Sequence, residues 1–167
     1  MAVERRFQKW VHVHFETRDY FVVANVAHLG LAGNISISLY EKSTGETTKS
    51  SKTSYWIRNE IRTDENYTLF EDPVSGSFMR LEADGGVSFC VYTPGMHFEG
   101  EASCYLGEPF TQITGYPNGL GAIQWWGNLA LQKGFVKCGY RVLQLEKGAK
   151  GAYDRTAGHR RMKLNWN

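Results

Sequence analysis

Hydrophobic and polar residues alternate along much of this chain with a period of two. The segment 9–16 shows the pattern most plainly, because Val11, Val13 and Phe15 alternate in it with the polar residues His12, His14 and Glu16. Segments 20–29 and 35–40 continue it, the first as a nearly unbroken apolar run. Side chains of a strand point alternately to two faces, so this pattern predicts strands with one buried face. We therefore expect three antiparallel strands joined by short loops.

The same alternation, interrupted by turn residues, recurs farther along. Asp84-Gly85 is the strongest hairpin signal in the chain, because both positions tolerate positive φ. Pro94-Gly95 marks another turn. Further strands are expected over residues 55–61, 78–82, 87–93, 96–106, 129–133, 134–138 and 140–145. For residues 55–61 a short helical turn is the alternative.

No segment of about ten residues shows a helical period, and turn signals recur every 8 to 12 residues or so, which favours an all-β sandwich or barrel. We predict an antiparallel meander that closes into a barrel, because closure removes exposed strand edges. The glycine-rich stretch 108–128 is either a mobile loop or a pair of bulged strands. Residues 1–150 are expected to form one β-barrel domain, and residues 151–167 a basic C-terminal tail.

Composition narrows the class of protein. The chain has 167 residues, about one domain's worth, and 19 basic against 17 acidic side chains give a formal charge of +2. This balance predicts no nucleic-acid partner. With no run of about 18 apolar residues and no secretory signal pattern, we expect a soluble, cytoplasmic protein without a membrane span. The three cysteines are scattered, and we expect reduced core thiols.

One strand carries a candidate metal site. His12, His14 and Glu16 lie at alternate positions, so two imidazoles and a carboxylate share one face. Such donors suit zinc, iron, nickel or manganese. The alternative is a polar strand face that meets solvent or lines a polar end of a barrel. The chain has no nucleophile elbow, P-loop or dinucleotide fingerprint, and no cofactor is expected.

The aromatic residues, 9 Phe, 9 Tyr and 5 Trp, are spread over nearly every expected strand. They either line a cavity for an elongated apolar molecule or fill a solid core, and the two interpretations remain open. The adjacent Trp125 and Trp126 are expected to point to opposite faces. Asn25 and His28 interrupt an apolar run, as hydrogen-bonded core residues or as cavity lining.

Short motifs resemble the lipocalin-like family of carotenoid hydratases (hydroxyneurosporene synthase type) and AttH. That family carries a block like W-M-D-H-E-W-G, followed by a strand that ends in Q-L-x-x-G. Trp126-Gly127 matches the end of the first motif and residues 144–148, QLEKG, match the second. The segments FEGE (98–101) and YLGEPF (105–110) precede them in the same order. The resemblance implies a lipocalin-like (calycin-type) barrel around an apolar ligand, with hydration or cyclisation of a polyene in some relatives.

This chain departs from the family in two ways. Ile123, Gln124 and Trp125 stand where the family block has ionisable residues, so the proton donor for hydration is missing there. The chain also corresponds to one half of a family built of two lipocalin-like halves. Because the chain matches only one of the two halves, we expect two copies to associate as a homodimer that restores the missing half.

Together these observations predict a protein that binds a small, largely apolar molecule, such as a polyene, polyketide or lipid, in a barrel cavity. The candidate ligand-binding residues are His12, His14, Asn25, His28, Tyr92, Gln124, Trp125 and Trp126. The alternatives are a barrel cyclase, isomerase or hydratase-like enzyme, a metal-dependent enzyme that uses His12, His14 and Glu16, and a structural or interaction domain. No catalytic residue is assigned.

Overall fold

A computed structural model describes residues 7–55, 60–105, 110–115 and 121–159. These residues form thirteen strands and no helix. The strands are β1 (Phe7–Glu16), β2 (Tyr20–His28), β3 (Ala32–Glu41), β4 (Glu46–Tyr55), β5 (Glu60–Thr63), β6 (Tyr67–Asp72), β7 (Ser77–Glu82), β8 (Gly86–Thr93), β9 (Met96–Cys104), β10 (Phe110–Gly115), β11 (Gly121–Cys138), β12 (Arg141–Gln144) and β13 (Lys150–His159). In these residues no helix is long and apolar enough to span a bilayer.

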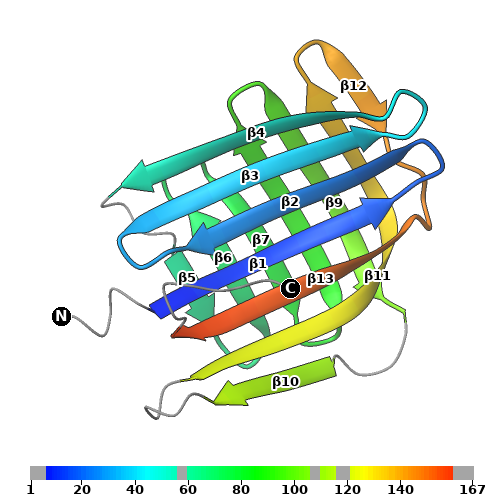
Figure 1. Cartoon of the computed structure of the whole chain (residues 1–167). Coiled ribbons are helices and arrows are strands. Elements are labelled where there is room, and N and C mark those ends of the chain that lie inside the picture. The colour runs from blue at the N-terminus through cyan, green and yellow to red at the C-terminus, as the bar shows by residue number, and fades with distance from the viewer. Residues whose placement is uncertain (1–6, 56–59, 106–109, 116–120, 160–167) are drawn as a thin grey trace.

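All thirteen strands belong to one antiparallel sheet, in the order β4-β3-β2-β1-β13-β11-β9-β8-β7-β6-β5, with β10 and β12 paired to β11. The sheet curls into a half-barrel whose two parts face each other (Figure 1). We call β4, β3, β2, β1, β13 and the first part of β11 the front layer. The remainder of β11 with β9 to β5 forms the back layer and crosses behind it (Figure 1).

The long strand β11 joins the two layers. Its residues 122–130 pair with β13 in the front layer, and its residues 129–138 pair with β9 in the back layer. The register shifts between Leu131 and Lys133, where the strand turns from one layer to the other. A bulge of this kind bends a strand, so the sheet can curl without breaking its hydrogen-bond ladder.

Apolar side chains from both layers fill the space between them. The largest fully buried ones are Phe15, Phe70, Phe89, Phe98, Ile35, Ile37, Met79, Leu129, Leu131, Val11, Val13 and Val22. Phe89 lies between two other rings, with ring centroids 5.7 Å from Phe15 and 4.6 Å from Phe98. Of the two interpretations of the aromatic residues, a packed core describes the middle of the space between the layers.

The predicted fold class is confirmed: the chain is all-β and antiparallel, and its sheet is curled as in lipocalin-like proteins. The predicted strands over 9–16, 20–29, 35–40, 87–93 and 96–106 correspond to β1, β2, β3, β8 and β9. The predicted hairpin at Asp84-Gly85 is present, with Gly85 at φ 89° between β7 and β8. Of the predicted strand 55–61, residues 56–59 lie outside the described residues.

The C-terminal segment differs from the prediction. Most of it is the strand β13, which lies between β1 and β11 in the middle of the sheet rather than in a tail after residue 150. Four of the ten residues of β13 are Gly or Ala and three are charged, so the strand lacks the alternation of large apolar and polar residues that marks a half-buried strand. Gly151 is required by this packing, because a Cβ there would overlap the His14 carbonyl oxygen of β1. Residues 160–167 of the predicted tail lie outside the described residues.

Candidate functional site

A cluster of three potential ligand side chains lies on the hairpin formed by β8 and β9. The two-residue turn Pro94-Gly95, with Gly95 at φ 80°, fixes the register so that Cys90 lies directly opposite Glu99 and Tyr92 opposite His97. Residues opposite each other in an antiparallel pair have Cβ atoms about 4.5–5.5 Å apart. The turn therefore brings the cysteine, the histidine and the glutamate together.

The cluster lies on the outer face of the back layer. The inward positions of this hairpin are fully buried, among them Val91 and Phe98, and the cluster residues alternate with them. Cys90 is nevertheless only 9% exposed, because neighbouring side chains cover it. The side chain of His97 is 18% exposed and that of Glu99 is 50% exposed. The cluster thus has one buried member and a solvent-accessible side.

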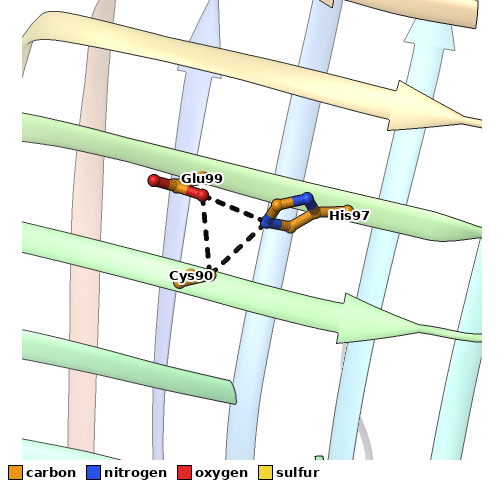
Figure 2. Close-up of side chains that lie close together, drawn as sticks. All are labelled: Cys90, His97 and Glu99. Atoms are coloured by element: carbon orange, nitrogen blue, oxygen red, sulfur yellow. Dashed lines mark hydrogen bonds and ion pairs between the residues drawn. The ribbon is translucent and has the colours of Figure 1, made fainter. Parts of the chain in front are cut away.

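The three side chains point toward one another across the two strands (Figure 2). His97 Nε2 lies 3.4 Å from Cys90 Sγ and 3.3 Å from Glu99 Oε2. Cys90 Sγ lies 3.8 Å from the same Glu99 oxygen. Among the described residues, this is the only group of three or more Cys, His, Asp or Glu side chains whose potential ligand atoms all lie within 4.8 Å of one another.

Two aromatic rings hold the His97 imidazole in place. The Tyr92 ring stacks on it, with centroids 4.1 Å apart and planes at 21°. The Phe135 ring of β11 meets it edge-on, with centroids 5.0 Å apart. These contacts restrict the imidazole to the orientation that directs Nε2 at the thiol and the carboxylate.

The surroundings shift the pKa values of the cluster. Burial raises the pKa of the Cys90 thiol, and burial lowers the pKa of His97 against the opposing attraction of Glu99. A hydrogen bond with Cys90 raises the pKa of Tyr92 to about 12. Near neutral pH the cluster therefore favours a protonated thiol and a neutral imidazole.

A hollow of about 510 Å³, which we call the outer hollow, opens beside the cluster. It is lined by Phe78, Ser88, Phe89, Cys90, Tyr92, Glu99, Gly100, Glu101, Lys133, Gly134, Phe135 and Gln144. These residues come from β7, β8, β9, β11 and β12. The Lys133 ammonium and a Glu101 carboxylate oxygen, 2.8 Å apart, form an ion pair at its rim. The outer hollow thus combines aromatic walls with a polar rim.

The other histidine-bearing strand face, on β1, does not assemble a ligand set. His12 and His14 point outward from the front layer, with ring centroids 6.0 Å apart. Glu16 is engaged by Lys42, whose ammonium lies 2.6 Å from its carboxylate. His12 instead faces Asp154 of β13 at 3.9 Å. The candidate metal set of His12, His14 and Glu16 therefore does not converge on one point, because Glu16 pairs with Lys42 and His12 faces Asp154.

The remaining sequence-predicted ligand residues are distributed over both faces of the sheet. Asn25 is opposite His12 in the register and shares its outward face. His28 shares the inward face of β2 with Val26, near the end of the strand. Tyr92 lines the outer hollow. The eight predicted residues do not form one cluster.

The tryptophan pair of β11 points to opposite faces, as predicted. Trp125 packs against the core, and Trp126 contacts the Phe110 ring of β10, with centroids 5.5 Å apart. Gln124 precedes them on the outward side and is opposite Thr156 in the register.

Trp125 also lines a smaller hollow of about 230 Å³ between the layers. There the Arg155 guanidinium stacks on the indole, 4.5 Å from the ring centroid, and donates a hydrogen bond to Thr68 Oγ1 at 2.9 Å. Burial lowers the pKa of this arginine. Asp64, Glu65 and Glu82 line the same hollow and give it an acidic rim.

Sequence reasoning missed the cluster, although the signal was present. Residues 96–104 alternate, so His97 and Glu99 share a face. A two-residue turn at Pro94-Gly95 implies that positions 90 and 99 are paired, which places the Cys90 thiol beside them. Combining the turn with the alternation would have found all three residues.

Two solved structures share this fold. An AttH-type protein from Nitrosomonas europaea superimposes with a TM-score of 0.62 at 11% identity, over 96% of this chain and 53% of that one. Kievitone hydratase from Nectria haematococca superimposes with a TM-score of 0.55 at 14% identity, over 92% of this chain and 48% of that one. The chain thus spans about half the length of either protein.

No protein-family model matches the sequence, and no curated protein matches it significantly. The two structural matches are consistent with the family resemblance of the sequence motifs, and at 11% and 14% identity they show a common fold. The class defined here is a lipocalin-like half-barrel with a Cys-His-Glu cluster beside an outer hollow.

Proposed function

We propose that the protein binds a small, largely apolar molecule in the outer hollow. The observation that carries the proposal is the lining, in which the side chains of Phe78, Tyr92 and Phe135 surround a volume of about 510 Å³. Small-molecule sites are typically hollows of ~300–1,000 Å³ with mostly apolar walls and a few placed polar groups. The size and the aromatic walls both fit this description.

The polar groups of the hollow indicate the shape of the ligand. Glu101 and Lys133 satisfy each other in an ion pair, and Gln144 adds an amide to the rim. An apolar body would lie against the aromatic rings, while one polar end reaches the rim and keeps its hydrogen bonds to protein or water. The proposal therefore favours a flat or elongated apolar ligand that has a single polar end.

The packed interior is the reason for placing the ligand outside the half-barrel. Phe15, Phe89 and Phe98 occupy the middle of the space between the layers and have relative exposures of 1% or less, and the hollow that remains between the layers is about 230 Å³. A ligand that entered there would have to displace these rings and lose their mutual packing. The outer hollow accepts a ligand without such a displacement.

The test uses a fluorescent probe with an apolar aromatic body and one sulfonate group, 8-anilinonaphthalene-1-sulfonate, and competition by a panel of polyenes, polyketides and fatty acids. Phe135→Ala removes a wall of the hollow, so we expect the probe's Kd to rise at least about tenfold, equivalent to ~1.4 kcal/mol. Phe21→Ala is the matched control, because Phe21 is also an outward, partly buried ring but lies on β2 against His14. Equal effects of the two variants, or no saturable binding, would contradict the proposal.

A hydratase-like activity at the same hollow is the second candidate. The specific observation in its favour is the His97–Glu99 pair, 3.3 Å apart beside the hollow, which can hold a proton and deliver it to a bound alkene. The pair would give its proton to one alkene carbon, water would bond to the other carbon, and the proton lost by that water would return to the pair, so that the net change is the addition of one water. Kievitone hydratase shares the fold, and this likeness of fold supports the candidate by analogy.

Incubation with alkene-containing members of the panel, followed by mass spectrometry, tests the second candidate. A product heavier by one water should appear with the unmodified protein and disappear in His97→Gln and Glu99→Gln, while probe binding remains. Unchanged turnover in both variants would remove this pair from the mechanism.

A further inference from the structure

We infer that Cys90, His97 and Glu99 bind a Zn²⁺ ion on the outer face of the β8–β9 hairpin. The ion would have one coordination position left for water or for a ligand in the outer hollow. This inference is independent of the proposed function, because metal binding is measurable without any organic ligand.

The donor set is the first argument. A thiolate, an imidazole and a carboxylate are the three side-chain types that zinc accepts in proteins. Zinc is of borderline softness, so a mixed set of sulfur, nitrogen and oxygen suits it better than it suits magnesium or calcium, which prefer oxygen alone. Zinc sites with three protein ligands keep a fourth position open.

The spacing of the donor atoms is the second argument. With zinc–sulfur bonds of about 2.3 Å and zinc–nitrogen or zinc–oxygen bonds of about 2.0–2.1 Å, tetrahedral angles place the donors about 3.3–3.6 Å apart. The His97 Nε2 atom lies 3.4 Å from Cys90 Sγ and 3.3 Å from Glu99 Oε2. The third separation, between Cys90 Sγ and Glu99 Oε2, is 3.8 Å. A shortening of this third separation by a few tenths of an ångström brings all three separations into the tetrahedral range.

The rigidity of the platform is the third argument. The cluster residues lie on paired strands whose inward neighbours Val91 and Phe98 are fully buried. Tyr92 and Phe135 fix the imidazole plane. Because the strands and the imidazole are already held in place, binding of an ion costs little conformational entropy.

The charge balance also fits a divalent cation. When the ion displaces the thiol proton into solvent, the resulting thiolate and the carboxylate supply two negative charges, which neutralise Zn²⁺. Of the lysines on the adjacent strand β11, Lys133 is paired with Glu101, and Lys137 lies opposite His97 in the register. Cys90 and Glu99 line the outer hollow, so the open position would face it.

Cobalt substitution tests the site in the full-length, reduced protein freed of metal by chelator. One equivalent of Co²⁺ should produce a thiolate-to-cobalt charge-transfer band together with the intense visible bands of tetrahedral cobalt, and one equivalent of Zn²⁺ should abolish both. Cys90→Ser should remove the charge-transfer band. His97→Gln and Glu99→Gln should each weaken binding by at least about tenfold.

The matched controls are Cys104→Ser, which removes a partly buried thiol at the end of β9, and His12→Gln, which removes an outward imidazole of β1. Both should keep the spectrum and the affinity of the unmodified protein. If Cys90→Ser does not fold, alkylation of the unmodified protein is the second measurement, since Zn²⁺ should protect Cys90 but not Cys104.

A missing charge-transfer band, a spectrum lost in Cys104→Ser, or a lack of protection by Zn²⁺ would each overturn the inference. In that case the three side chains form a hydrogen-bonded cluster only. Probe binding to the outer hollow, measured in the same preparations, shows separately whether the proposed function stands.

Discussion

Two outward faces of the same sheet carry histidines, and only one of them gathers its polar groups around a point. On β1, His12 and His14 follow each other at alternate positions, and their ring centroids are 6.0 Å apart. On the β8–β9 hairpin, the His97 imidazole, a thiol and a carboxylate meet within 3.8 Å. The contrast shows that polar spacing along one strand is a weaker signal for a site than pairing across strands.

The geometry of a sheet explains the difference. Alternate residues of a strand are separated by about 6.6–6.8 Å, whereas residues directly opposite on paired strands are about 4.5–5.5 Å apart. Cys90 is opposite Glu99, so a third donor joins the pair on β9. On β1, His12 has the Asp154 carboxylate opposite it, but the neighbours of His14 are Val23 and Ala152, which offer no donor, so no third donor joins that pair.

The largest expected effect concerns the interior that separates the two faces. Phe98→Ala should lower the free energy of unfolding by about 3–5 kcal/mol, because it leaves a cavity beside the Phe15 and Phe89 rings. Phe135→Ala, on the outer face, should cost less than about 2 kcal/mol. Denaturant unfolding measures both changes. Equal losses in the free energy of unfolding for the two variants would contradict the packed interior and would make the interior a candidate ligand site again.

A middle-sized effect is expected from filling the outer hollow. Ser88 lines it, and Ser88→Trp places a large ring inside, so probe affinity should fall at least about tenfold with little change in stability. Ser36→Trp is the control on the outer face of β3, where no effect on affinity is expected. Fluorescence titration compares the two variants. A loss of affinity in Ser36→Trp instead would move the site to the front layer.

The smallest expected effect is a pH dependence on the β1 face. Burial lowers the pKa of His14 below its usual 6.5, so between these two values the unfolded chain binds more protons than the folded protein. The free energy of unfolding should therefore fall as the pH drops through 6.5 toward the lowered value. His14→Gln should reduce the slope of the free energy of unfolding against pH. The pKa of His12 is also lowered, so His12 should account for the slope that remains.

Denaturant unfolding over a pH series from about 5 to 8 measures this dependence. Ser38→Asn, an outer-face change on β3 without a titrating group, should leave the slope as it is in the unmodified protein. A steeper slope in His14→Gln would contradict the account of this face as a structural one.

Much of the fold was predictable because its strands alternate. Strands such as β1 and β9 have one buried and one outward face, and this contrast is visible in the sequence. Strand β4 was missed because it has no buried residue and therefore no contrast. Strand β13 was missed because close packing against its neighbours requires small residues rather than large apolar ones, as at Gly151.

The site was less predictable than the fold. The motif His12-x-His14 stood out because its residues are close in sequence, but its side chains have separate partners. Cys90 and Glu99 are nine positions apart, and only the register of the hairpin makes them neighbours. Long-range pairing of this kind is set by turns and by the burial of the opposite face, which a search for local motifs does not use.

Amide NMR of the labelled protein, titrated with 8-anilinonaphthalene-1-sulfonate, tests the central claim most directly, because it locates the ligand without altering any side chain. The account predicts that the largest shift changes fall on residues 88–92, 99–101 and 133–135, which line the outer hollow. Largest changes on residues 10–16 and 21–25, or in the smaller hollow around Trp125 and Arg155, would contradict it.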